Sequence, residues 1–318
     1  MTHSSEITAH EGYLPFKVDS VDRGCRTFYK IIGDLSCGSP PLVCLHGGPG
    51  GTHGGLLAYS EMWTRHRIPV VLYDQIGAGA STHLPELAGN ESFWQVSPFI
   101  AQLDSLLDGL RLRDNGFYLL GHSFGAVLAA DFATTQPRGL RKLILSSGYA
   151  SKELSAQGQE LRRKELPPAV QNTIDKANAA HDFENEEYIE AVVEYLHYAM
   201  CRADSALPML RQFVETLKEN TVLTTMNGPS LTLGGQGSMR DWTVIPRLHR
   251  ISVPTLIWNG EYDTQHDIAV QPFFDLIPHA KWITFPKASH SPLFEGPELR
   301  ETVLRTAGDF LSASDDVA

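Results

Sequence analysis

A serine flanked by glycines stands between an apolar run and a segment rich in small residues. It is Ser123 in the stretch Gly121-His122-Ser123-Phe124-Gly125, a GxSxG pattern preceded by the apolar run at 117–120. The pattern predicts a sharp strand-to-helix turn that exposes a nucleophilic hydroxyl, with glycines where strand and helix approach too closely for side chains. A plain strand-helix turn is the alternative, but the surrounding YLLGHSFGAVLAA favours the nucleophile.

A serine that attacks a carbonyl also needs N–H donors for the negative charge that develops on the carbonyl oxygen. The run His46-Gly47-Gly48-Pro49-Gly50 follows the apolar LVCL and supplies a loop whose backbone can approach a substrate closely. We expect the N–H of Gly48, with that of Gly47 as the alternative, to act together with the N–H of Phe124. A glycine-rich turn needed only for tight packing is the competing interpretation.

The serine further needs a base, and the base needs a group that orients it. In hydrolases with a GxSxG turn, the acid follows the serine along the chain and the histidine follows the acid. His290 lies in a short polar loop after the apolar KWITF, and Asp263 lies in Asn-Gly-Glu-Tyr-Asp after PTLIW. Both positions follow strands, so both side chains can converge on Ser123.

Other titratable residues near these positions remain alternatives. Glu261, His266 and Asp267 lie beside Asp263 in the sequence and are weaker candidates for the acid or the base. His46 and His122 flank the glycine loop and the serine, and we expect them to hold these loops by hydrogen bonds.

Strands alternate with helices along most of the chain, which predicts an α/β fold with a mostly parallel sheet. We expect strands at 26–33, 42–45, 69–74, 117–120, 140–146, 254–258 and 281–285, and helices at 99–112, 126–134 and 299–311. Between 151 and 239 the sequence reads as helices alone, including 186–200 and 207–217. The predicted organisation is a core in two parts, 1–150 and 241–318, with a helical cap at 151–240 above the ligand-binding edge of the sheet.

Composition narrows the function classes. The 318 residues carry a net charge of -11, which disfavours nucleic acid as a partner because phosphate binding needs a basic surface. No apolar run reaches the length of a membrane span, and the polar start Met1–His10 lacks the features of a signal peptide, so we expect a cytoplasmic protein. No metal-ligand spacing occurs among the His and Cys residues, so no metal or cofactor is predicted. The expected partner is a small molecule or short peptide, and the oligomeric state is left open.

Motifs along nearly the whole chain resemble the proline iminopeptidase family, a branch of the α/β-hydrolases. They are EGYLPFK, HGGPGG, Tyr-Asp-Gln at 73–75, GHSFGA, Met-Asn-Gly-Pro at 226–229, Asp-Trp at 241–242, GEYD and the late Ser-His. The MNGP and DW elements are most similar to tricorn-interacting aminopeptidases and amino-acid amidases. The resemblance implies an α/β-hydrolase fold and the removal of N-terminal residues, often proline, from short peptides, or the hydrolysis of amino-acid amides.

The resemblance also implies a cap glutamate after MNGP that binds the free amino group of the substrate. Here Leu231 stands at that position. Glu187, Glu190 or Glu194 of the cap could replace the missing carboxylate, although charges on a helix usually form a solvated face. The candidate substrate-binding residues are therefore Leu231, Glu194 and Trp258.

Three functions are compatible with these observations. The first is an exopeptidase or amino-acid amidase with an acyl intermediate on Ser123. The second, motivated by Leu231, is a hydrolase or acyl-transfer enzyme of specialised metabolism that acts on an ester, a lactone or a neutral amide. The third is a non-catalytic binding protein, which has no need to keep Ser123, Asp263 and His290 together.

Overall fold

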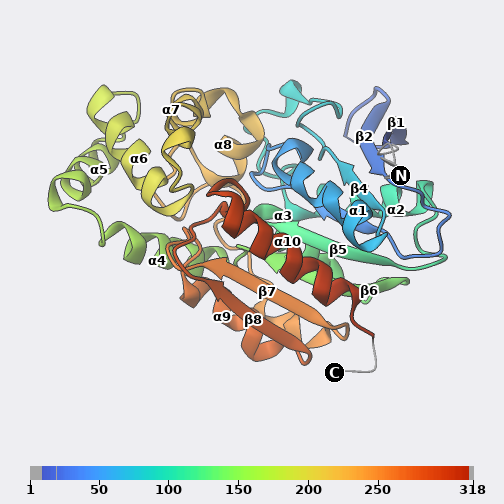
Figure 1. Cartoon of the computed structure of the whole chain (residues 1–318). Helices are drawn as coiled ribbons and strands as arrows, with labels where there is room; N and C mark the ends of the chain where they lie inside the picture. The colour runs from blue at the N-terminus through green and yellow to red at the C-terminus, as the bar shows by residue number, and fades with distance from the viewer. Residues whose placement is uncertain (1–8, 19, 315–318) are drawn as a thin grey trace.

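The computed structural model describes residues 9–18 and 20–314 of the chain (Figure 1). A single sheet runs through the molecule with strand order β1-β2-β4-β3-β5-β6-β7-β8. Its strands are β1 (Ala9–Phe16), β2 (Cys25–Ile32), β3 (Leu42–Leu45), β4 (Val70–Tyr73), β5 (Phe117–His122), β6 (Leu140–Ser146), β7 (Thr255–Gly260) and β8 (Ala280–Phe285). The pairings of β1 with β2 and of β2 with β4 are antiparallel, and the other pairings are parallel. The expected mostly parallel sheet is confirmed.

Helices cover both faces of the sheet. On one face, α2 (Val96–Gly109), α3 (Phe124–Ala133) and α9 (Asp267–Leu276) contribute to the larger apolar core. On the other face, α1 (Glu61–His66) and α10 (Pro297–Ser312) pack over a second core. The central strands β3 and β4 are buried along their whole length, as strands covered on both sides must be.

Three core elements were not expected from the sequence, and each has a weak local signal. β1 is a largely exposed strand with a glycine and a proline, so it lacks an apolar run. α1 is only six residues long. α9 contains Pro272, a residue that normally argues against a helix interior.

The segment between β6 and β7 is largely helical up to Asn227, but residues 228–244 contain no helix, although the sequence suggested helices up to 239. It comprises α4 (Lys152–Arg163), α5 (Pro168–Ala180), α6 (Glu186–Ala199), α7 (Leu207–Glu215) and α8 (Thr221–Asn227). Helices α5 to α7 bury an apolar cluster of their own, separate from the two cores of the sheet. In Figure 1 the helices α5 to α8 gather at one end of the molecule, beyond the sheet. We refer to residues 151–240, which include these helices, as the cap.

Membrane-spanning helices are absent from the described ranges, where no helix combines the necessary length and apolarity. The expectation for Met1–His10 falls largely outside these ranges, because the structure does not describe residues 1–8.

Candidate active site

Ser123 occupies the turn between β5 and α3, in an unusual backbone conformation. Its φ is 56° and its ψ is -120°, a combination that side-chain-bearing residues rarely adopt. A Cβ on Gly121 would lie 2.1 Å from the carbonyl oxygen of Gly125, and a Cβ on Gly125 would lie 2.0 Å from that of Leu45. The contact between strand and helix therefore requires glycine on both sides of the serine, as the GxSxG pattern predicts.

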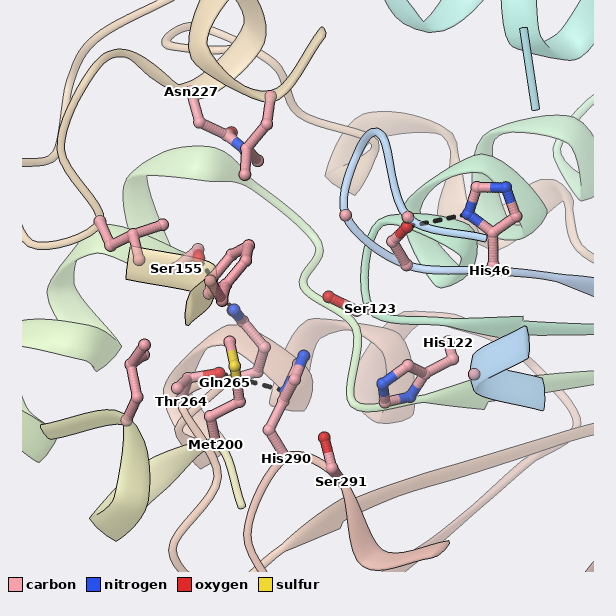
Figure 2. Close-up of a pocket in the computed structure, with 18 of the residues that line it drawn as sticks. His46, His122, Ser123, Ser155, Met200, Asn227, Thr264, Gln265, His290 and Ser291 are labelled. Carbon is pink, nitrogen blue, oxygen red and sulfur yellow. Dashed lines mark hydrogen bonds between the residues drawn. The ribbon is translucent and has the colours of Figure 1, made fainter. Parts of the chain in front are cut away.

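Asp263 and His290 come together in the loops that follow β7 and β8. His290 Nδ1 lies 2.6 Å from Asp263 Oδ1, and the same carboxylate oxygen accepts the backbone N–H of Gln265 at 2.8 Å. Burial acts to raise the pKa of Asp263, but the charge and hydrogen bond of His290 and the bond from Gln265 outweigh it and lower this pKa. Because Nδ1 faces Asp263, Nε2 is left for the cavity, and Figure 2 shows the imidazole facing the hydroxyl of Ser123.

The glycine-rich loop after β3 lies against the serine. A Cβ on Gly47 would be 2.9 Å from the Cβ of Ser123, and Gly47 and Gly48 both line the cavity above it. Phe124 is the first residue of α3, so its N–H belongs to the helix turn that has no carbonyl partner within the helix. Gly47, Gly48 and Phe124 thus belong to the two segments next to Ser123, the loop after β3 and the start of α3.

His46 holds this loop in place in a defined tautomer. Its Nε2 accepts the backbone N–H of Gln75 at 2.9 Å, so Nδ1 carries the proton that it donates to the carbonyl oxygen of Gly47 at 2.9 Å. Burial lowers the pKa of His46 to about 4, which keeps the ring neutral near pH 7. The hydrogen bonds that we expected of His46 are present.

His122 and Trp258 share Ser146 as a partner, and of the two only His122 lines the cavity. The indole Nε1 of Trp258 donates to Ser146 Oγ at 2.7 Å, and His122 Nδ1 lies 3.1 Å from the same oxygen. Burial, and secondarily the charge of His290, lower the pKa of His122 to about 3. Trp258 is fully buried and is not among the cavity-lining residues, so its place is that of a support for Ser146.

A cavity of about 420 Å³ lies between Ser123 and the cap. Figure 2 shows Asn227 on the cap side, well apart from Ser123 and His290. The wall that the cap contributes to the cavity is mostly apolar. It includes Leu196, Met200, Leu210, Phe213, Leu231 and Leu233. Polar groups come from Lys152, Gln159, Asn227 and Gln265. None of the described residues that line the cavity is an aspartate or a glutamate.

The cap is hydrogen-bonded to the loops that carry Asp263 and His290. The carbonyl oxygen of Ala199, at the end of α6, accepts the backbone N–H groups of Thr264 and His290, each at 3.1 Å. From α4, the guanidinium of Arg162 donates to the carbonyl oxygens of Asp263 at 3.1 Å and Glu261 at 2.8 Å. The cap therefore fixes both loops as well as covering the cavity.

Glu295 makes a further link of the same kind. One carboxylate oxygen accepts the backbone N–H of Arg202 in the cap, and the other accepts that of Ser289 beside His290, both at 2.8 Å. Sequence reasoning missed Arg162, Glu295 and Lys152. Each of the three binds a residue that is remote in the chain, so no local motif marks them.

A metal site is not evident in the described part of the chain, where no group of three or more His, Cys, Asp or Glu side chains could hold an ion.

Comparison with known proteins shows the family to which this chain belongs. Residues 40–297 match the family described as alpha/beta hydrolase fold. A proline iminopeptidase from Levilactobacillus brevis is 30% identical over 313 residues, which cover 96% of this chain and 98% of that protein. The chain belongs to the proline iminopeptidase family. It is thus a hydrolase with an α/β-hydrolase fold, as its motifs indicate.

Two solved structures match over almost the whole length. The proline iminopeptidase of Mycobacterium smegmatis has a TM-score of 0.82 and 28% identity, and the match covers 94% of this chain and 97% of that one. VinJ has a TM-score of 0.84 and 38% identity, with coverage of 95% and 99%. The likeness to both includes the cap, because it spans nearly the whole chain.

Of the residues that the sequence offers as substrate-binding candidates, some line the cavity and others do not. Leu231 lines the cavity, where the resemblance implies a glutamate. Glu194 is exposed on α6 and borders a different hollow on the cap, together with Glu190 and His197. Glu187 is exposed as well. The structure thus brings Leu231 to the cavity but neither Glu194 nor Trp258.

Proposed function

We propose that this chain hydrolyses an amide or ester bond through an acyl-enzyme on Ser123, with His290 as general base and Asp263 as the group that orients it. The observation that carries the proposal is the buried 2.6 Å contact between Asp263 and His290, next to a serine held at positive φ. His290 Nε2 takes the proton of Ser123 Oγ while Oγ bonds to the carbonyl carbon of the substrate. The oxyanion accepts hydrogen bonds from the N–H of Phe124 and that of Gly48, with Gly47 as the alternative donor.

In the steps that follow, His290 acts first as an acid and then again as a base. His290 gives its proton to the leaving nitrogen or oxygen, and the bond between that atom and the carbonyl carbon breaks. Water then gives a proton to His290 and attacks the carbonyl carbon of the acyl ester. The bond from that carbon to Ser123 Oγ breaks while His290 returns the proton to Oγ, which releases the acid and restores Ser123. No electrons are exchanged with a cofactor in this scheme.

We propose that the substrate is a short peptide, from which the N-terminal residue is removed, or an amino-acid amide. Membership in the proline iminopeptidase family supports this class. The cavity volume of about 420 Å³ suits a small molecule, and the cap that covers it disfavours a folded protein.

A second candidate substrate is an ester, a lactone or a neutral amide, and one specific observation favours it. No aspartate or glutamate is found among the described residues that line the cavity, and Leu231 stands where an amine-binding carboxylate is implied. An ammonium group buried without a counter-charge costs several kcal/mol, which is enough to exclude a substrate.

A substrate screen beside the variant Ser123→Ala tests the proposal. Prolyl, alanyl and phenylalanyl anilides are compared with their N-acetyl forms and with short p-nitrophenyl esters. We expect Ser123→Ala to lose at least about 10³-fold in kcat without a change in thermal unfolding. Activity of Ser123→Ala within tenfold of the wild type contradicts the acyl-enzyme. Cleavage confined to free-amine anilides supports the first substrate class, and cleavage of esters or N-acetyl anilides alone supports the second.

A further inference from the structure

A lysine of the cap borders the cavity, and the proposed reaction does not use it. Lys152 is the first residue of α4, and its Nζ donates to Oδ1 of Asn227, the last residue of α8, at 2.8 Å. The ring of Tyr149 lies 5.8 Å from the same nitrogen. Lys152, Asn227 and Tyr149 all line the cavity. The first and last helices of the cap thus meet at a polar point in the cavity wall.

The charge of Lys152 is not matched within the cavity. It is the only lysine or arginine among the described residues of the lining, and no aspartate or glutamate accompanies it there. An ammonium has three N–H donors, and the amide oxygen of Asn227 is a neutral acceptor for one of them. Burial lowers the pKa of Lys152 to about 8, so the group is still mostly protonated at pH 7. A partly desolvated cation of this kind is stabilised most by an anion.

We propose that Lys152, oriented by Asn227, binds a carboxylate of the substrate inside the cavity. The inference rests on the proposed hydrolysis at Ser123 and specifies the class of molecule that is cleaved. The carboxylate has two chemical sources. It is either the C-terminal carboxylate of a dipeptide, which belongs to the leaving group, or a carboxylate at the far end of the acyl group.

Matched substrate pairs test the proposal and separate the two sources. Alanyl-alanine and alanyl-alanine amide differ only in a carboxylate on the leaving group. Mono-p-nitrophenyl glutarate and p-nitrophenyl pentanoate differ in the end of the acyl chain. We expect the wild type to prefer the carboxylate member of one pair. The variant Lys152→Met should lower kcat/KM for that member by about tenfold or more, mainly through KM, because a charge-assisted hydrogen bond is lost.

Further variants distinguish recognition from a structural role. Lys152→Arg keeps the charge and should retain part of the preference. Asn227→Asp places a carboxylate against Lys152 and should abolish the preference in the same way as Lys152→Met. Lys176→Met removes an exposed lysine from cap helix α5 and should behave as the wild type. An equal loss on both members of a pair in Lys152→Met, or an unchanged preference, overturns the proposal.

A binding measurement keeps this test independent of catalysis. Isothermal titration of glutarate into Ser123→Ala should show binding that is absent in the double variant Ser123→Ala/Lys152→Met, and 1,5-pentanediol should bind to neither. If the wild type cleaves none of the substrates, the proposed reaction fails, and the titration alone decides on the carboxylate site. Equal binding of glutarate to both variants overturns it.

Discussion

At the scale of single residues, the site depends on close approaches that only small or specific side chains permit. The glycines at 121 and 125 leave room for strand β5 and helix α3 to meet at Ser123. His46 stays neutral through burial and fixes the carbonyl of Gly47, so the neighbouring amides are held before a substrate arrives. Donors that are already in position lower the cost of stabilising a developing charge.

Substitutions at position 231 test which acyl group the cavity accepts. Leu231 lines the cavity, so Leu231→Glu would introduce the carboxylate that the family resemblance implies. We expect kcat/KM for alanyl or prolyl anilide with a free amine to rise by about tenfold or more, because the substrate ammonium gains a charge-assisted partner. The isosteric control Leu231→Gln should not show this gain. An equal response of both variants contradicts a role for charge at this position.

At the scale of elements, hydrogen bonds join the cap to the loops that carry Asp263 and His290. The end of α6 binds the backbone beside Asp263 and at His290, α4 binds the Asp263 loop through Arg162, and Glu295 ties Arg202 to Ser289. These contacts join segments that are about 60 to 100 residues apart in the chain. Helices that cover a ligand site can thereby also set the geometry of its reacting groups.

Arg162 is therefore expected to position the acid loop without touching the substrate. Its guanidinium is buried, and its removal in Arg162→Met leaves the carbonyl oxygens of Glu261 and Asp263 without these donors. We expect kcat for a p-nitrophenyl ester to fall by about tenfold or more while KM changes little. Arg163→Met is the matched control, because Arg163 pairs with Glu160 and Asp175 within the cap. Similar kinetics in the two variants contradict the positioning role.

At the scale of the whole molecule, the burial of histidines near Ser123 couples stability to pH. His46 is 2% exposed and its pKa falls from 6.5 to about 4 in the folded chain. Between these values the unfolded chain binds the extra proton, so the free energy of unfolding decreases as the pH falls through this window. The decrease from His46 amounts to about 3 kcal/mol in all. His122 contributes in the same direction, because burial lowers its pKa as well.

Urea denaturation at pH 7 and pH 4.5 measures this effect. We expect the wild type to lose stability on acidification, and His46→Gln to lose less of it. The slope against pH should be shallower in the variant by up to about 1.4 kcal/mol per pH unit, which corresponds to one proton. Identical slopes for the two proteins contradict the assignment of the lowered pKa to His46.

Local sequence patterns were sufficient to predict the α/β architecture, the order of most strands and helices, and the candidates Ser123, Asp263 and His290. Apolar runs, the GxSxG turn and polar loops after strands are local signals, and parallel strands bring their carboxyl ends to one edge. Which cap residues reach the cavity could be seen only in the folded chain. It placed Leu231 and Lys152 there and left Glu194 on the outside of α6 and Trp258 in the core. The physical reason is that packing between distant segments sets the direction in which a side chain points. The local sequence around a charged residue of a helix, or an aromatic residue of a strand, therefore does not show which neighbour it contacts.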